Sequence, residues 1–209
     1  MFSIIKHIFI LTSITLIISA CSTMNKNECL NADWRTIGYS DGARGYNASR
    51  VGQHQSACAE FGVRPDLNAY NSGREQGLGQ YCIPTTGYNR GLSGYRYNGV
   101  CARHNEREFV DALNYGLAVY KEAQLLKKLK SEYQKEKNYI HKLEDELRFK
   151  EDQLVSGRLS KVKAVIILNE TKEMAEELGK AKSNLANLDY DINKQARRVN
   201  RMKRQSGYH

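Results

Sequence analysis

Apolar residues recur at alternating steps of three and four along the second half of the chain, which is the spacing of a coiled-coil helix. One series covers 126–154, with seven of nine positions apolar or aromatic, and a second covers 164–202, with ten of twelve apolar. Between them, only Ser-Gly-Arg at 156–158 has the composition of a turn. Two helices of similar length joined by so short a link fold back on one another. The pattern therefore predicts an antiparallel coiled-coil hairpin over 106–205, with its turn near 156–158.

One stretch of the predicted hairpin departs from the coiled-coil pattern. Residues 165–168, Val-Ile-Ile-Leu, are apolar all round, whereas the outer face of a coiled coil is normally polar. Val165 and Ile166 fall on outer positions of the heptad register. They predict a partner-binding patch at the distal end of the hairpin. The alternative is a local slip in register that buries both side chains.

The first half is rich in glycine and tyrosine: 13 of the 16 glycines lie between residues 38 and 116, and nine of the 13 tyrosines lie between residues 39 and 120. Three octets, which begin at Gly38, Gly73 and Gly87, contain glycines four residues apart. On a helix this spacing puts both glycines on one face, where another backbone can approach closely. We therefore expect short helices that pack tightly under tyrosine rings.

Local start and stop signals divide this first half into helices. Asp33 is a good N-cap, and a second Asp follows the proline that opens the third segment, so helices are expected over about 33–44, 47–62 and 65–82. Residues 83–105 are expected to form a loop before the long hairpin. The predicted fold class is all-α.

The N-terminus has the order of an export signal, with positive charge ahead of an apolar run at 8–18. Eleven residues are too few to cross a bilayer as a helix, because roughly 20 are needed. The run leads into Ile-Ser-Ala-Cys at 18–21, which resembles the lipobox of bacterial lipoproteins. This resemblance predicts a cleaved signal peptide over 1–20.

Lipid attached to Cys21 would then hold the protein on a membrane without a transmembrane helix. A short tether over 21–32 is expected to follow the anchor. Ser22, rather than Asp, follows the cysteine, which by resemblance to known sorting rules favours the outer membrane of the bacterial envelope. The alternative is that Cys21 merely follows an ordinary cleavage site.

If the chain is exported, the other four cysteines are expected to form disulfides, because disulfides form outside the cytoplasm and are rare within it. Four cysteines indicate two disulfides with three possible connectivities, and adjacency favours Cys29 with Cys58 and Cys82 with Cys101. One alternative is a metal site, although no CxxC pair occurs. Another is a Cys–His nucleophile formed by His54 and Cys58, which requires a reduced thiol. We expect disulfides, and no metal or cofactor.

The net charge of +9 suggests an acidic partner. Nucleic acid is excluded as a normal partner by the predicted export. Anionic lipid head groups, lipopolysaccharide phosphates and cell-wall carboxylates remain. The alternative is a positive charge that only keeps the surface soluble.

A combined motif runs through the first half of the chain. Its residues are Asp33-Trp34, Ile37-Gly38, Asp41-Gly42, Ala57-Cys58-Ala59, Gly62, Pro65-Asp66, Tyr70, Gly73-Arg74, Gly77-Leu78, Tyr81-Cys82, Gly87-Tyr88, Gly91, Gly94, Tyr97 and Gly99-Val100-Cys101. Together they resemble the uncharacterised bacterial lipoproteins known as domain-of-unknown-function family 2799, over about 29–120. The resemblance implies an exported, lipid-anchored head with paired cysteines, here assigned to 33–105, and implies no particular activity.

Tyrosines interspersed with arginines in the head favour ligand binding, because tyrosine offers a flat apolar face and a hydroxyl. The candidate binding residues are Asp41, Arg74, Tyr88 and Arg90, besides the pair at the hairpin end. The alternative is that most of the rings form the core of a domain poor in Leu and Ile.

The expected function is an envelope binding or scaffolding lipoprotein without catalysis. Its partner would be an envelope protein, peptidoglycan or a second copy of the chain. The alternative is a cell-wall saccharide hydrolase, or an accessory factor of one, because carboxylates in the head could supply the acidic pair that such cleavage needs.

Overall fold

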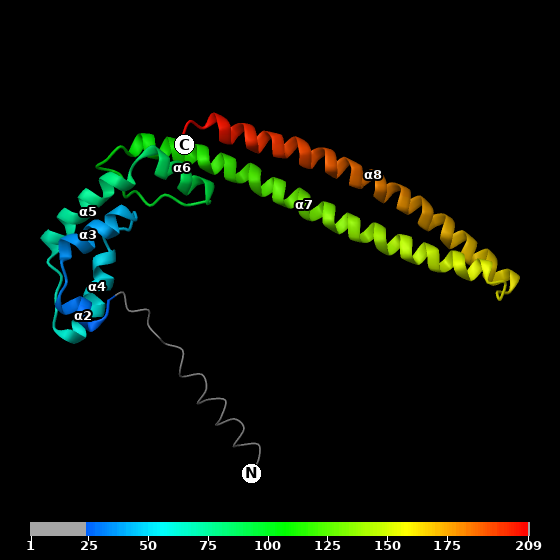
Figure 1. The fold of residues 1–209 in the computed structure, drawn as a ribbon, viewed down its shortest axis with the longest axis horizontal. Helices are drawn as coiled ribbons and strands as arrows, with labels where there is room; N and C mark the ends of the chain where they lie inside the picture. Colours follow the sequence, from blue (N-terminus) through cyan, green and yellow to red (C-terminus); the bar gives the residue numbers. More distant parts are fainter. Residues whose placement is uncertain (1–23, 209) are drawn as a thin grey trace, which may run out of the picture. The chain divides into compact units, whose positions relative to one another are not determined.

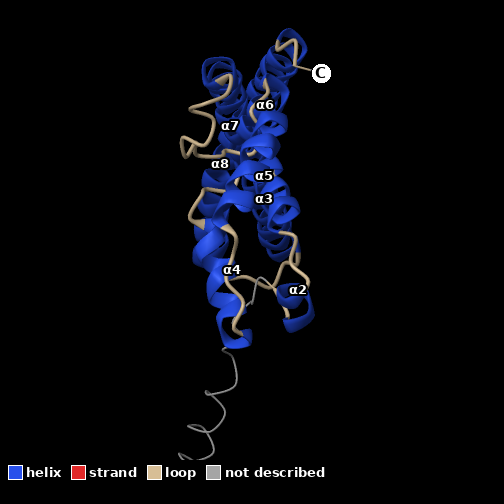
Figure 2. Cartoon of the chain, turned by 90° about the vertical axis from the view of Figure 1, so that its left-hand side faces the viewer, coloured by secondary structure: helices blue, strands red, loops and turns tan. Residues whose placement is uncertain are grey.

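The computed structural model describes residues 24–208, and every regular element in this range is a helix (Figure 2). The all-α prediction is therefore confirmed. The helices are α2 (Lys26–Leu30), α3 (Trp34–Ala43), α4 (Arg50–Cys58), α5 (Leu67–Tyr81), α6 (Pro84–Leu92), α7 (Glu106–Val155) and α8 (Lys161–Gln205), with a 3₁₀ turn at Ala59–Phe61.

The described residues form two compact units. The first unit extends to Thr86 and includes Tyr97–Phe109, and the second unit contains Gly87–Arg96 and the chain from Val110 onward. The sequence-based boundary near residue 105 differs from this division. Residues 87–96 were assigned to the head from composition, yet they pack with the hairpin.

Glycine contacts hold α3 against α5 in the first unit (Figure 1). A Cβ added at Gly38 would lie 2.0 Å from the carbonyl oxygen of Tyr70, and one at Gly42 would lie 2.1 Å from that of Arg74. Gly73 of α5 faces the α3 backbone in the same way. Residue numbers rise together along this contact, so the two helices run in parallel. The glycine spacing thus has the role that the sequence predicted.

Aspartate caps begin both of these helices. The carboxylate of Asp33 accepts hydrogen bonds from the backbone N–H groups of Arg35 and Thr36, at 3.1 and 3.3 Å. Asp66 accepts from the N–H groups of Asn68 and Ala69, at 2.9 and 3.0 Å. These N–H groups have no partner within their own helix, so the caps determine where each helix starts.

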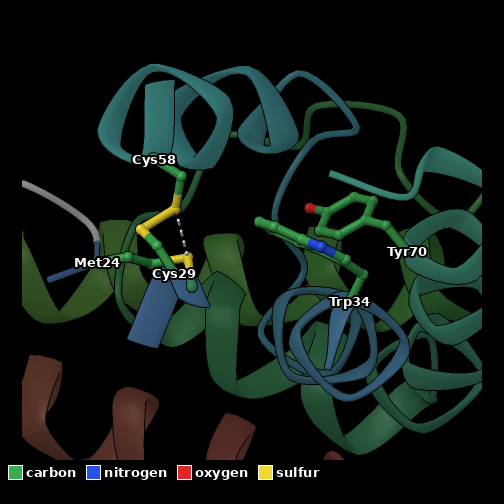
Figure 3. Close-up of a cluster of buried hydrophobic side chains, with 5 residues drawn as sticks. All are labelled: Met24, Cys29, Trp34, Cys58 and Tyr70. Carbon is green, nitrogen blue, oxygen red and sulfur yellow. Dashed lines mark hydrogen bonds between the residues drawn. A yellow bond between two sulfur atoms is a disulfide. The ribbon is translucent and has the colours of Figure 1, made fainter. Parts of the chain in front are cut away.

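The core of the first unit surrounds a disulfide between Cys29 and Cys58 (Figure 3). Trp34 and Tyr70 pack beside it, and the Cys58 sulfur lies 3.9 Å from the sulfur of Met24. A disulfide sulfur has no proton to donate, so this last contact is packing between two polarisable atoms. The segment predicted as a tether therefore contains α2 and supplies two buried side chains.

A second disulfide joins Cys82, at the end of α5, to Cys101. Both pairs are those that adjacency along the chain favours. Tyr97 lies beside this bridge: its hydroxyl accepts a hydrogen bond from the Cys101 N–H at 2.9 Å and donates one to Glu106 at 2.7 Å. Phe109 packs under the Tyr97 ring, with 5.5 Å between ring centroids. The irregular segment before α7 is thus held at several points.

The second unit is an antiparallel hairpin, as predicted (Figure 1). Along its seam, Tyr115 of α7 donates to the carbonyl oxygen of Met202 in α8 at 2.9 Å. Gln195 is a buried polar residue in the seam and donates to the backbone oxygen of Glu122 at 2.9 Å and to its carboxylate at 2.7 Å. Only residues 156–160 link the two helices.

The prediction of a loop over 83–105 is wrong for its first part, because residues 84–92 form α6. Its contact with α7 again uses glycine. A Cβ at Gly91 would lie 2.2 Å from the Leu113 carbonyl oxygen, and one at Gly116 would lie 2.3 Å from that of Tyr88. This close backbone contact stabilises a helix whose local composition resembles a loop.

Candidate functional site

Asp41 is the centre of a buried polar cluster in the first unit. Its Oδ2 accepts a hydrogen bond from the Tyr70 hydroxyl at 2.8 Å and lies 2.8 Å from His54 Nε2. An ionised carboxylate can only accept, so this nitrogen carries the proton. The three side chains come from α3, α4 and α5. Asp41 therefore links all three helices.

Burial, the larger cause, and the hydrogen bond to Asp41, the smaller one, together raise the pKa of Tyr70 far above its usual value. The phenol thus stays protonated and serves as a donor. The sequence hypothesis that His54 activates Cys58 is wrong, because Cys58 is bonded to Cys29. Cys58 therefore supplies no free thiol to this cluster.

Arg74, another predicted binding residue, is also buried. Its Nε and Nη2 donate to the carbonyl oxygen of Tyr46 at 3.2 and 2.9 Å, which fixes the connection between α3 and α4. Beside it lies a polar pocket of about 570 Å³ whose lining includes Glu75 and Arg103. The guanidinium is therefore already bonded to the protein's own backbone.

A second pocket of about 380 Å³ is lined by three carboxylates, those of Glu28, Asp33 and Asp41, and by His54. Glu28 accepts from the Asn25 N–H at 2.7 Å in a capping box. Hydrogen bonds from Thr36 lower the pKa of Asp33, whereas a general acid for saccharide cleavage needs a raised pKa. Each carboxylate accepts hydrogen bonds that hold the fold.

Tyr88 and Arg90, also predicted to bind, belong to the second unit. Tyr88 is buried, with its ring centroid 5.4 Å from that of Tyr208 and 6.2 Å from that of Tyr115. Arg90 lies over the ring of Tyr95, 5.5 Å from its centroid. Tyr88 is thus part of the core, as the alternative interpretation of the tyrosines holds.

Val165 and Ile166 lie at the distal end of the hairpin and are 58% and 50% exposed. The alternative of a register slip that buries them is therefore wrong. Other large apolar side chains near the turn are exposed as well: Phe149, Val155, Val162 and Leu168. We call residues 155–168, which contain the turn and the start of α8, the hairpin tip.

Two exposed residues of the hairpin tip, Val155 and Val162, were not singled out from the sequence, although they flank the predicted turn. The sequence did name Tyr70 and His54, but not as partners of Asp41. They meet Asp41 only through the packing of three helices, for which the sequence has no local signal. Cys21 lies outside the described residues, as does the predicted signal peptide. No helix within residues 24–208 is both long and apolar enough to cross a membrane.

The fold and its sites define an all-α protein with a disulfide-stapled unit and a helical hairpin. Residues 33–118 match the model of a family described as proteins of unknown function, DUF2799. The resemblance to this family inferred from the sequence is thus confirmed over these residues, and the match does not test the lipid anchor. Comparison with curated proteins and with solved structures found no match.

Proposed function

We propose that this chain is a lipid-anchored protein of the bacterial envelope that acts as a binding or scaffolding module and performs no catalysis. The proposal rests on the exposed apolar side chains of the hairpin tip. Its apolar side chains are exposed at the end of helices of 50 and 45 residues. An apolar surface held at the end of a long support is suited to contact with a partner.

The predicted anchor supports the same proposal. Lipid on Cys21 would hold one end of the chain at a membrane. The outer membrane is the proposed location because Ser22 follows the cysteine.

The polar groups of the first unit favour binding over catalysis. A glycoside hydrolase needs two carboxylates free to act on the substrate, one of them with a raised pKa. Here Asp33 caps α3 and Asp41 accepts from Tyr70. The shared pocket of Glu28, Asp33 and Asp41 is the one observation that favours the runner-up, a cell-wall saccharide hydrolase.

An assay with purified peptidoglycan distinguishes a binding protein from a saccharide hydrolase. We expect the full chain to release no soluble saccharide fragments from it. Co-sedimentation with the insoluble sacculus, or capture of a defined envelope protein, would measure binding without turnover. The proposal would be overturned if the parent chain released fragments and Asp33→Asn abolished this release. Asp191→Asn, at an exposed position, is the control and should then still release them.

A further inference from the structure

The exposed apolar side chains of the hairpin tip do not share one helix face. In α8, Val162, Val165, Ile166 and Leu168 are 72%, 58%, 50% and 59% exposed. At 3.6 residues per turn these four positions span an arc of about 160° around the helix. Val155, at the end of α7, is 83% exposed. A flat protein surface would cover one side of this arc, whereas acyl chains can surround the whole tip.

The charges of the tip have one sign. Between Val155 and Leu168 the sequence contains three basic residues, Arg158, Lys161 and Lys163, and no acidic residue. All three are exposed, and none of them forms an ion pair within the described chain. The tip therefore combines an aliphatic surface with unneutralised positive charge.

The charge pattern changes next to the tip. Lys150 of α7 forms an ion pair with Glu170 of α8, with 2.6 Å between nitrogen and oxygen. Further from the turn, Lys182 pairs with Glu144 at 2.8 Å. Cross-helix ion pairs thus occur along the shaft of the hairpin, whereas none of the ion pairs found within residues 24–208 involves residues 155–168.

We propose that the hairpin tip inserts its aliphatic side chains into the headgroup–acyl boundary of a membrane that contains anionic lipid. Arg158, Lys161 and Lys163 would bind lipid phosphates while their stems lie along the apolar layer. The apolar stretch is far shorter than a membrane span, which fits shallow insertion. This inference names the partner of the binding surface proposed above and rests on that proposed function.

A fluorescent reporter at the tip tests insertion directly. Val165→Trp is introduced into the full chain, and Tyr190→Trp, at an exposed position far along α8, is the matched control. Each variant is mixed with phosphatidylethanolamine–phosphatidylglycerol vesicles whose acyl chains carry bromine, which quenches indole fluorescence within the apolar layer. The signal of the parent chain, from Trp34, is subtracted. Insertion depth is measured rather than binding alone, because the N-terminal segment could also hold the chain on vesicles.

We expect bromine to quench the indole introduced by Val165→Trp and to leave the one introduced by Tyr190→Trp unchanged. When Lys161→Ala and Lys163→Ala are added to the Val165→Trp variant, the affinity of tip insertion should fall about thirtyfold. The reason is that each basic residue contributes about 1 kcal/mol near an anionic surface. Vesicles of phosphatidylcholine alone should show a larger loss, because they remove the anionic partner of Arg158 as well.

Absence of quenching for Val165→Trp, while the chain still sediments with the vesicles, would overturn lipid insertion. Equal quenching at both positions would also overturn it, because the hairpin would then lie flat on the membrane. A dimer that sedimentation velocity detects in the parent chain and not in Val165→Glu/Ile166→Glu would instead identify a second copy as the partner. None of these results affects the peptidoglycan assay, so failure of this inference and failure of the proposed function are distinguishable.

Discussion

At the scale of single residues, two glycines of α5 lie in opposite surroundings. A Cβ at Gly77 would lie 2.2 Å from the carbonyl oxygen of Tyr39, whereas nothing lies within 4 Å of one at Gly79. Gly77→Ala should therefore destabilise the first unit by about 1 to 3 kcal/mol, because α3 and α5 must move apart. Gly79→Ala should stabilise it by about 0.5 to 1 kcal/mol through the better helix propensity of alanine. Urea unfolding measures both, and equal effects would contradict the close helix contact.

The buried phenol of Tyr70 predicts sensitivity to alkali. Burial and the hydrogen bond to Asp41 raise the pKa of Tyr70 in the folded chain above its ordinary value of 10.0. Above that pH the folded state binds more protons than the unfolded state, so stability is complete below it and falls as the pH rises beyond it. Tyr70→Phe should weaken this fall and cost about 1 kcal/mol at neutral pH through the lost hydrogen bond. Unfolding measured on both sides of pH 10.0 checks this, with Tyr190→Phe as an exposed control.

Residue-scale signals explain which parts of the fold were predictable. The caps at Asp33 and Asp66 and the glycine spacings act within a few residues, so they are readable from the sequence. Pro84 at the first position of α6 was an available signal that the neighbouring glycines obscured. The cluster around Asp41 depends on contacts between three helices. Its polar partners could not be assigned without the tertiary structure.

At the scale of elements, the hairpin has a buried seam and an exposed tip. Val165→Glu with Ile166→Glu should leave the melting temperature of the chain nearly unchanged, because both side chains are already half exposed. Ile140→Glu, at a seam position that is 6% exposed, should lower stability by several kcal/mol by burying a charge. Thermal unfolding followed by circular dichroism compares the two. Equal losses would mean that the tip residues are buried in solution.

The heptad pattern predicted both arms of the hairpin because each arm repeats one local rule over many turns. The series of the second arm also contained two polar exceptions at seam positions, Thr171 and Gln195. The structure satisfies both: Thr171 donates to the Leu168 oxygen at 2.8 Å, and Gln195 donates to Glu122. A buried polar residue of this kind favours one register over its neighbours.

At the scale of the whole molecule, the two units differ in covalent support. All four paired cysteines lie in the first unit, and the second unit contains no cysteine. Reduction should therefore destabilise the first unit, since loss of a native disulfide typically costs about 2 to 5 kcal/mol. The hairpin should keep its helicity. Circular dichroism with and without reductant measures this, and loss of all helical signal on reduction would show that the hairpin depends on the disulfides.

Attachment of lipid to the whole molecule is predicted to depend on one thiol, that of Cys21. Serine lacks the sulfur nucleophile that takes the lipid, so Cys21→Ser should abolish lipid attachment and processing by the lipoprotein peptidase. Metabolic labelling with a fatty acid, together with the N-terminal sequence of the exported chain, measures both steps. Ser22→Ala is the matched control, because it changes the neighbouring residue and keeps the thiol. A Cys21→Ser chain that still gains lipid and is cleaved before residue 21 would refute the anchor at this cysteine.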